Sequence, residues 1–237
     1  MDRRIRVALT AAPLLVSLTS YAQQAGDTIA SVGVASLNPE AGLSPVSSSS
    51  VVFTGLLSGT RADIGSTTTA TFGVLHMLTD HFGAELTLGV PPTLDISLTV
   101  PNGTPPQSHP NAAKARAWTP ALVGKWLFNS PGSAWRPYLG LGVSYAYFDH
   151  VRINQADPLV VTLAGGSAEL DSSWTPVYNA GFIYRINDRW SVNASVSYLP
   201  LKSKVTLGGS GAGAGVTTRT TLDINPTDVV LRIGYRF

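Results

Sequence analysis

Apolar and polar residues alternate along the last nine positions of the chain, residues 229–237. One face of this segment carries Val229, Leu231, Ile233, Tyr235 and Phe237, and the other carries Val230, Arg232, Gly234 and Arg236. A period of two residues predicts a β-strand. Because two arginines lie opposite the apolar face, the pattern is typical of a barrel strand with lipid on one side and a polar lumen on the other.

Seven further segments show related alternation. They are residues 27–37, 67–78, 82–90, 118–128, 138–147, 174–186 and 190–198. The connections between the eight segments alternate between long stretches and short turns, as they do in outer-membrane barrels. We therefore predict an all-β fold, an eight-stranded antiparallel transmembrane β-barrel with four long extracellular loops, short periplasmic turns and both termini in the periplasm.

The four long connections are residues 38–66, 95–115, 149–171 and 201–218. Their Gly, Ser and Pro content predicts loops, with a short structured insert near residues 51–57. The fourth connection, residues 201–218, is expected to be flexible because it contains the glycine-rich run 208–215. Within the barrel, small inward residues such as Gly140 and Gly142 are expected to leave room in the lumen.

Aromatic residues and prolines mark the expected limits of the membrane. Trp118, Trp126, Trp174, Trp190, Tyr198 and Tyr235 collect at strand ends, as an interfacial girdle requires. The prolines Pro91, Pro92, Pro120, Pro176, Pro200 and Pro226 lie near the height at which a tilted strand of roughly 9–11 residues leaves the hydrocarbon. Ordinary loop prolines are the alternative interpretation.

Residues 1–22 have the features of a secretory signal peptide. Three arginines begin the segment, an apolar stretch follows at residues 7–18, and small residues, Ser20 and Ala22, precede the expected cleavage point. The apolar stretch is shorter than the roughly 18–20 residues that a membrane anchor needs. We predict cleavage after residue 22, a single barrel domain over residues 23–237 and a location in the cell outer membrane.

Composition excludes several classes of function. Charged residues make up only 13% of the chain, about half their usual share in a soluble domain. The absence of cysteine excludes disulfides and thiolate chemistry. Three of the 16 basic and one of the 14 acidic residues lie in residues 1–22, so the remaining chain is neutral. No nucleic-acid partner and no cofactor are therefore expected.

The four histidines do not form a recognisable motif for catalysis or metal binding. His76, His81, His109 and His150 are too scattered for a metal signature. Some eight-stranded barrels modify lipid A acyl chains, and His150 beside Asp149 or His109 beside Ser108 could contribute to such a site. A nucleophile and its base must meet within about 3 Å, and loop histidines are more commonly solvated. We predict that the protein is not an enzyme.

Charged and small polar residues fall on the inward faces of the predicted strands. Glu85, Lys125, Arg185, Arg232 and Arg236 are inward by parity, as are Thr87, Ser195 and Ser197. A charge facing lipid near the midplane would cost about 2–4 kcal/mol, so the charged residues are expected to pair across the lumen. Two interpretations remain open, a salt-bridged plug that stiffens the barrel and a charged constriction that selects permeants.

Prolines also suggest an opening in the barrel wall. Pro91 and Pro92 on one predicted strand face Pro120 on the next at a similar height. Proline has no backbone N–H to donate to a ladder, so the two strands could separate there. A lateral gap and simple strand termination are the two possible interpretations.

Five motifs together resemble the OmpW family of outer-membrane proteins. They are Thr79-Asp80-His81-Phe82-Gly83-Ala84-Glu85-Leu86, Pro120-Ala121-Leu122 leading to Lys125-Trp126-Leu127-Phe128, Trp135-Arg136-Pro137-Tyr138-Leu139-Gly140-Leu141-Gly142, Asp171-Ser172-Ser173-Trp174, and Ile233-Gly234-Tyr235-Arg236-Phe237. The resemblance implies an eight-stranded barrel with a narrow lumen, associated with passive entry of small hydrophobic molecules, including hydrocarbons in an alkane-import branch. It also implies that the barrel-assembly machinery reads the terminal aromatics Tyr235 and Phe237.

The inward residues depart from the family pattern, in which bulky apolar side chains line the lumen. Thr87, Ser195 and Ser197 instead favour either a wetter interior or an interior closed by hydrogen bonds. Two functions follow. The first is passive uptake of small hydrophobic molecules through the lumen or a lateral opening, with outer-membrane lipid as the surrounding partner. The second is a non-conducting structural barrel that presents its extracellular loops to a partner.

Overall fold

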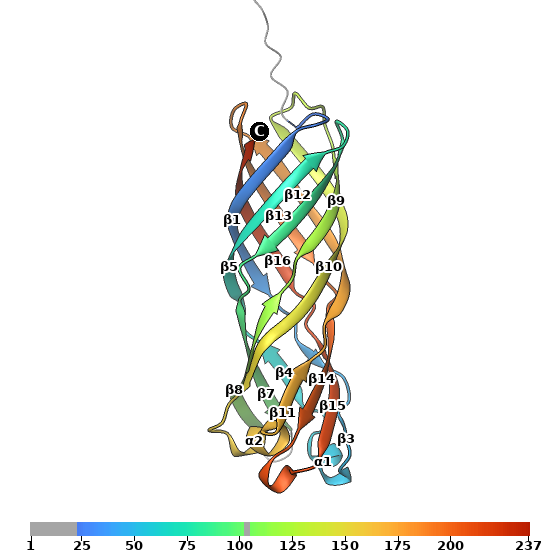
Figure 1. The fold of residues 1–237 in the computed structure, drawn as a ribbon, viewed down its shortest axis with the longest axis vertical. Helices are drawn as coiled ribbons and strands as arrows, with labels where there is room; N and C mark the ends of the chain where they lie inside the picture. Colours follow the sequence, from blue (N-terminus) through green and yellow to red (C-terminus); the bar gives the residue numbers. More distant parts are fainter. Residues whose placement is uncertain (1–22, 102–104) are drawn as a thin grey trace, which may run out of the picture.

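The computed structural model describes residues 23–101 and 105–237, so the predicted signal peptide lies outside the described residues. Eight antiparallel strands close a barrel (Figure 1). They are β1 (Thr28–Asn38), β5 (Thr67–Met77), β6 (Phe82–Gly89), β9 (Ala121–Leu127), β10 (Trp135–Ile153), β12 (Ser173–Arg185), β13 (Trp190–Tyr198) and β16 (Thr227–Arg236). They pair in the order β12-β13-β16-β1-β5-β6-β9-β10, and pairing of β10 with β12 closes the ring. The predicted eight-stranded barrel is confirmed.

Short turns join the strands at the end of the barrel where the C-terminus lies, which we call the turn end (Figure 1). Two of these turns are held by their own side chains. Thr79 Oγ1 accepts hydrogen bonds from the amides of His81 and Phe82, and Asn187 Oδ1 accepts from the amides of Arg189 and Trp190. Such side-chain bonds replace the ladder bonds that a reversing chain loses.

The observed burial follows the alternation in the sequence. In β16, Val229, Leu231 and Ile233 are between 44% and 54% exposed, whereas Val230 and Arg232 are 6% exposed. The outer surface of the barrel is therefore apolar and the interior contains the charges. Exposed apolar side chains around a closed barrel are stable in lipid, where all ladder hydrogen bonds are already satisfied.

Aromatic side chains form two belts around the barrel. Near the turn end, Trp190 packs edge-on against Tyr235, and Trp135 stacks on Phe182. Near the other end, which we call the loop end, rings pair within two groups, Tyr145 with Trp174 and Tyr178 with Tyr198. Amphipathic rings favour the interface between hydrocarbon and water.

Beyond the barrel, the long connections fold into two further sheets (Figure 1). β10 continues past the ring to pair with β8 (Gln107–Trp118), which pairs with β7 (Thr93–Val100), which pairs with β4 (Arg61–Ile64). The second sheet contains β11 (Ser167–Leu170), β14 (Lys202–Gly208), β15 (Thr217–Asp223), β2 (Gly42–Leu43) and β3 (Ser47–Ser48). The helices α1 (Val51–Leu56) and α2 (Pro158–Ala164) and the 3-10 turn η1 (Gly211–Gly213) lie at the tip. No helix in the described ranges is long and apolar enough to cross a membrane.

The prediction of loops over residues 95–115 and of a flexible segment over residues 201–218 is therefore wrong. Most of these residues belong to β7, β8, β14 and β15. β15 reads Thr-Thr-Arg-Thr-Thr-Leu-Asp, a sequence with almost no apolar alternation. Its strand form depends on pairing with β14 along seven residues, which local pattern does not reveal. The predicted insert near residues 51–57 is the helix α1.

An apolar cluster lies between the two outer sheets, next to the barrel. It consists of Ala62, Ile64, Leu94, Ile96, Ala117, Ala146, Leu201, Leu222 and Ile224, and we call it the neck. These residues come from both sheets and from β10, so burial of the neck fixes the extension on the barrel. Burying each large apolar side chain contributes about 1.5–3 kcal/mol before entropy is counted.

Most of the conspicuous prolines lie where the barrel strands stop. Pro91 and Pro92 follow β6, Pro120 precedes β9, Pro200 follows β13 and Pro226 precedes β16. Pro176 differs, because it lies inside β12 opposite Val143, although β13 pairs with β12 only from Tyr178 onward. The glycines of β10 leave no free room, because a Cβ at Gly140 would lie 2.9 Å from Val123 Cγ1.

Candidate functional site

A buried cluster of charges crosses the lumen near mid-barrel. Glu85 on β6 accepts from Lys125 Nζ on β9 at 2.7 Å and from Arg232 Nη1 on β16 at 2.8 Å. The side chains of all three residues are at most 6% exposed. Thr87 Oγ1 also donates to Glu85 Oε1 at 3.0 Å. We call Glu85, Lys125 and Arg232 the floor, because they close the lumen from wall to wall.

The pairing of the floor depends on strands that are far apart in sequence. Arg232 reaches β6 by passing over Gly73 on β5, where a Cβ would lie 2.5 Å from Arg232 Nη1. Glycine at this position makes room for the guanidinium group. The floor contains two cations and one carboxylate, so it retains an excess positive charge, and buried Arg232 Nε has no hydrogen-bond partner among the described residues.

Two residues that the sequence analysis did not single out support the floor from the turn-end side. Tyr138 on β10 is 2% exposed. Its hydroxyl lies 3.3 Å from Lys125 Nζ and within 3.3 Å of the side-chain amide of Asn193 on β13. Parity along β10 places Tyr138 inward, opposite in orientation to Leu139, so the alternation of that strand could have identified it.

The barrel between the floor and the turn end is filled. Ile29, Leu75, Met77, Leu127, Tyr138 and Ile183 form one buried apolar cluster. Arg136, which is 1% exposed, donates to the backbone oxygens of Gln23 and Asp80 at the turn end. Arg185 donates to the Gly132 carbonyl at 2.8 Å, and Arg236 pairs with Asp27 at 3.2 Å. Arg185 and Arg236 are thus placed near the turn end and not in the floor.

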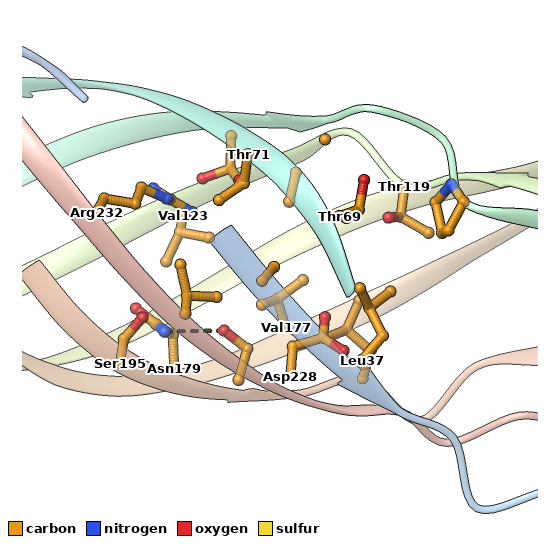
Figure 2. A pocket seen from close by; sticks show the side chains of 18 of the residues that line it. Leu37, Thr69, Thr71, Thr119, Val123, Val177, Asn179, Ser195, Asp228 and Arg232 are labelled. Carbon is orange, nitrogen blue, oxygen red and sulfur yellow. Dashed lines mark hydrogen bonds between the residues drawn. The ribbon is translucent and has the colours of Figure 1, made fainter. Parts of the chain in front are cut away.

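Above the floor lies a cavity of about 80 Å³, which we call the lumen cavity (Figure 2). Asn179, Ser195 and Asp228 lie on one side of it, and Thr69, Thr71 and Thr119 lie opposite. Asn179 donates to Ser197 Oγ at 2.9 Å, the bond drawn in Figure 2. Of the residues predicted to face the lumen, Thr87, Ser195 and Ser197 line this cavity, as do Glu85 and Arg232 of the floor.

The backbone pairing between β6 and the segment that leads into β9 is interrupted beside the lumen cavity. Pairing between β6 and β9 runs only as far as Thr87 and Ala121. Pairing between the two chain segments resumes with Thr93 and Arg116, just beyond a hydrogen bond from the Ala117 amide to the Pro92 carbonyl at 3.0 Å. Residues 88–91 and residues 118–120 are not paired with each other. Pro91 and Pro92 line the cavity at this height, and Pro120 lies on the opposite margin.

A second cavity, of about 110 Å³, lies between the two outer sheets. We call it the outer cavity. Its walls are almost entirely apolar and include Leu57, Leu98, Ile153, Leu163, Ala168 and Leu207. Ala62, Ile96 and Leu222 belong to both the neck and the outer cavity, whereas Ala117 belongs to both the neck and the lumen cavity. The neck therefore lies between the two cavities.

Helix α2 covers one side of the outer cavity and is fixed by Asp157. The Asp157 Oδ1 atom accepts from the amides of Leu159 and Val160, and Oδ2 accepts from His109 Nδ1 on β8 at 2.6 Å. Burial acts to raise the pKa of Asp157, but the hydrogen bonds from His109 and the two amides outweigh it and lower that pKa. Val160 and Leu163 of α2 then face the outer cavity.

Replacing Asp157 by alanine is expected to destabilise α2 locally by about 0.5–2 kcal/mol, the range for losing an N-cap. Because the folded-state pKa is lowered, the Asp157 contribution is complete above the ordinary value near 3.8 and is lost as pH falls through the lowered pKa. Hydrogen-exchange protection factors of the α2 amides measure both effects. Asp157→Asn, which retains a capping oxygen, should keep more of the protection and lose the pH dependence. Equal protection in Asp157→Ala and the parent would show that Asp157 does not fix α2.

The two histidine and acid combinations differ from those of a catalytic set. His109 pairs with Asp157, and His150 Nδ1 lies 3.0 Å from Asp149 Oδ1. Within residues 23–101 and 105–237, neither histidine is hydrogen-bonded to a serine hydroxyl. The structure thus brings together no serine nucleophile with either base in the described ranges.

A closed barrel with an apolar outer surface, two aromatic belts and a buried charge cluster in its lumen is an outer-membrane β-barrel. The OmpW family model matches residues 24–237. Outer membrane protein W of Vibrio cholerae is 30% identical over 234 residues, covering 98% of this chain and 96% of that protein. Outer membrane protein AlkL of Ectopseudomonas oleovorans is 23% identical, with 77% of this chain and 72% of that protein covered. The chain belongs to the OmpW family.

Solved structures show the same fold. The crystal structure of OprG from Pseudomonas aeruginosa has a TM-score of 0.77 at 24% identity, covering 91% of this chain and 98% of that chain. The solid-state NMR structure of AlkL in lipid bilayers has a TM-score of 0.63 at 19% identity, covering 100% of this chain and 97% of that chain. The protein is therefore a member of a family of outer-membrane barrels and is located in the outer membrane.

Proposed function

We propose that this barrel admits small hydrophobic molecules passively from the cell surface and releases them sideways through its wall. The proposal rests on the order in which cavities and side-chain clusters follow one another along the interior of the protein. The apolar outer cavity is followed by the neck and then by the lumen cavity, which is closed below by the floor and bordered by an interrupted ladder.

The two ends of this route have different chemistry. Apolar walls favour removal of a hydrocarbon from water, at about 25 cal/mol per Å² of buried apolar surface. Below the lumen cavity, the floor and the apolar cluster around Met77 and Leu127 fill the barrel. The break beside Pro91, Pro92 and Pro120 is the proposed exit from the cavity into lipid.

The orientation and biogenesis of the chain follow from the same proposal. The signal peptide, residues 1–22, would direct export, and both termini would face the periplasm. Phe237 is 79% exposed at the turn end, where the barrel-assembly machinery could read it together with Tyr235. Outer-membrane lipid would surround the apolar belt.

Filling the outer cavity is expected to slow uptake. Ala168 on β11 lines this cavity, whereas the adjacent Glu169 is exposed. Ala168→Phe should reduce uptake of octane by vesicles with lipopolysaccharide in the outer leaflet, because the ring occupies the apolar space. Glu169→Phe adds the same ring on the outside of the same strand and should leave uptake unchanged.

The alternative, a non-conducting barrel that presents its outer sheets to a partner, makes the opposite prediction. Octane uptake with the parent protein would then equal that of protein-free vesicles. Equal uptake by Ala168→Phe and Glu169→Phe, both faster than protein-free vesicles, would instead exclude the outer cavity from the route.

A further inference from the structure

Several buried polar atoms without hydrogen-bond partners lie around one cavity. Among the described residues, Asn179 Oδ1, Asp228 Oδ1 and Arg232 Nε are buried and unpaired. All three residues line the lumen cavity. Leaving a buried polar group unsatisfied costs about 1–3 kcal/mol, and more for a charged one. Three such atoms around one cavity indicate that something other than protein satisfies them.

The strand register brings two of these groups into one row. Asn179 on β12 is opposite Ser197 on β13, and Ser197 is opposite Asp228 on β16. Asn179 donates its amide hydrogens to Ser197 Oγ and to the Val196 carbonyl. Those bonds fix the amide group, so that its oxygen remains available as an acceptor. The row therefore offers acceptor oxygens from both Asn179 and Asp228.

A hydrogen-bond donor, in contrast, lies at the floor. Arg232 is on the same strand as Asp228, four residues nearer the turn end, and it lies to the left of Asp228 in Figure 2. The Nε–H of Arg232 is a donor without an acceptor. The cavity consequently has acceptors along one side and a donor at its base, whereas the neck above it is apolar.

We propose that the lumen cavity binds the hydroxyl end of an amphipathic molecule, such as a medium-chain primary alcohol, whose hydrocarbon chain points toward the neck. The hydroxyl group donates to Asp228 or Asn179, and its oxygen can accept a hydrogen bond. This inference rests on the proposed route and refines it. A molecule with a terminal hydroxyl group is held in the lumen cavity by hydrogen bonds, whereas a plain hydrocarbon can form none there.

The test is a binding measurement on the protein in lipid nanodiscs. The side-chain amide signal of Asn179 and the Nε–H signal of Arg232 are followed by NMR while 1-octanol or octane is added to equal mole fractions in the bilayer. We expect octanol to shift the Asn179 signal, and the Arg232 signal if the head reaches the floor, whereas octane leaves both in place. No shift with octanol, or equal shifts with both compounds, would overturn the proposal and leave the cavity merely hydrated.

Variants of the row provide the control. Asp228→Leu should weaken octanol binding about tenfold, as expected for losing one hydrogen bond. Val229→Leu alters the adjacent, lipid-facing residue of the same strand and should have no effect. If Asp228→Leu does not fold, Ser197→Ala, which releases the Asn179 amide, serves instead and should reduce the octanol shift. Unchanged octanol binding in the folded row variant would also overturn the proposal.

Failure of this inference is distinguishable from failure of the proposed function. Uptake of octane, which has no hydroxyl group, into vesicles tests the route alone. Binding of octanol in nanodiscs tests the cavity without any uptake. A barrel that takes up octane but does not bind octanol would refute only the inference.

Discussion

Glu85→Ala is expected to lower the free energy of unfolding by about 3–5 kcal/mol, the cost of removing one partner from a buried ion pair. The side chains of Lys125 and Arg232 are 3% and 6% exposed, so removing the carboxylate leaves two buried cations without their counter-ion. The measurement is urea unfolding from lipid vesicles, followed by tryptophan fluorescence.

Removing the whole floor is the matched control. The triple variant Glu85→Leu, Lys125→Met, Arg232→Leu leaves no unpaired charge and should recover most of the loss, because apolar replacement of a buried ion cluster is often neutral. A loss below about 1 kcal/mol in Glu85→Ala would be the size of a surface pair and would contradict a buried floor.

The floor variants also separate a plug from a selecting constriction. A plug predicts lower stability with unchanged single-channel conductance in Lys125→Ala and Arg232→Ala, because the apolar cluster around Met77 and Leu127 still fills the barrel below. Altered conductance would favour the constriction.

Closing the wall with a disulfide is expected to stop uptake of octane. Extending the register beyond Thr87 and Ala121 places Gly89 opposite Thr119, and both residues line the lumen cavity. A Cβ at Gly89 would meet nothing closer than 3.7 Å, so a cysteine at this position has room, and Gly89→Cys is combined with Thr119→Cys. The chain has no cysteine of its own. Oxidation should reduce uptake to the level of protein-free vesicles, and a reductant should restore it.

The control disulfide lies where the wall is already closed. Leu86 and Leu122 are register partners on the lipid-facing side. Cross-linking cysteines there should leave uptake unchanged. If the Gly89 and Thr119 pair is fully oxidised and uptake persists, the molecules do not leave between β6 and β9.

The residues that build the barrel were predictable because lipid imposes a strict local rule. Each strand must alternate apolar and polar side chains, so Leu231 and Arg232 reveal their orientations without any knowledge of neighbours. The same parity placed Glu85, Lys125 and Arg232 inward. Parity alone could not separate them from Arg185 and Arg236, since height along the barrel depends on strand stagger and tilt.

The extension beyond the membrane obeys no such rule. Water satisfies an exposed backbone as well as a ladder does, so β14 and β15 have no need of a strong apolar pattern. Their order comes from pairing with each other and from the neck. The two cavities likewise exist only because segments distant in sequence face one another.

The sequence by itself therefore determined the class of fold, the number of barrel strands, the inward or outward orientation of the side chains on those strands, and the family. Only the tertiary structure decided which charges meet, that Asn179, Asp228 and Arg232 retain unpaired atoms around one cavity, and that the long connections form sheets. The physical reason is the separation in sequence between the residues whose contacts decide each feature. Alternation is fixed by each residue's contact with lipid or lumen, whereas pairing, stagger and cavities depend on contacts between segments as far apart as Glu85 and Arg232.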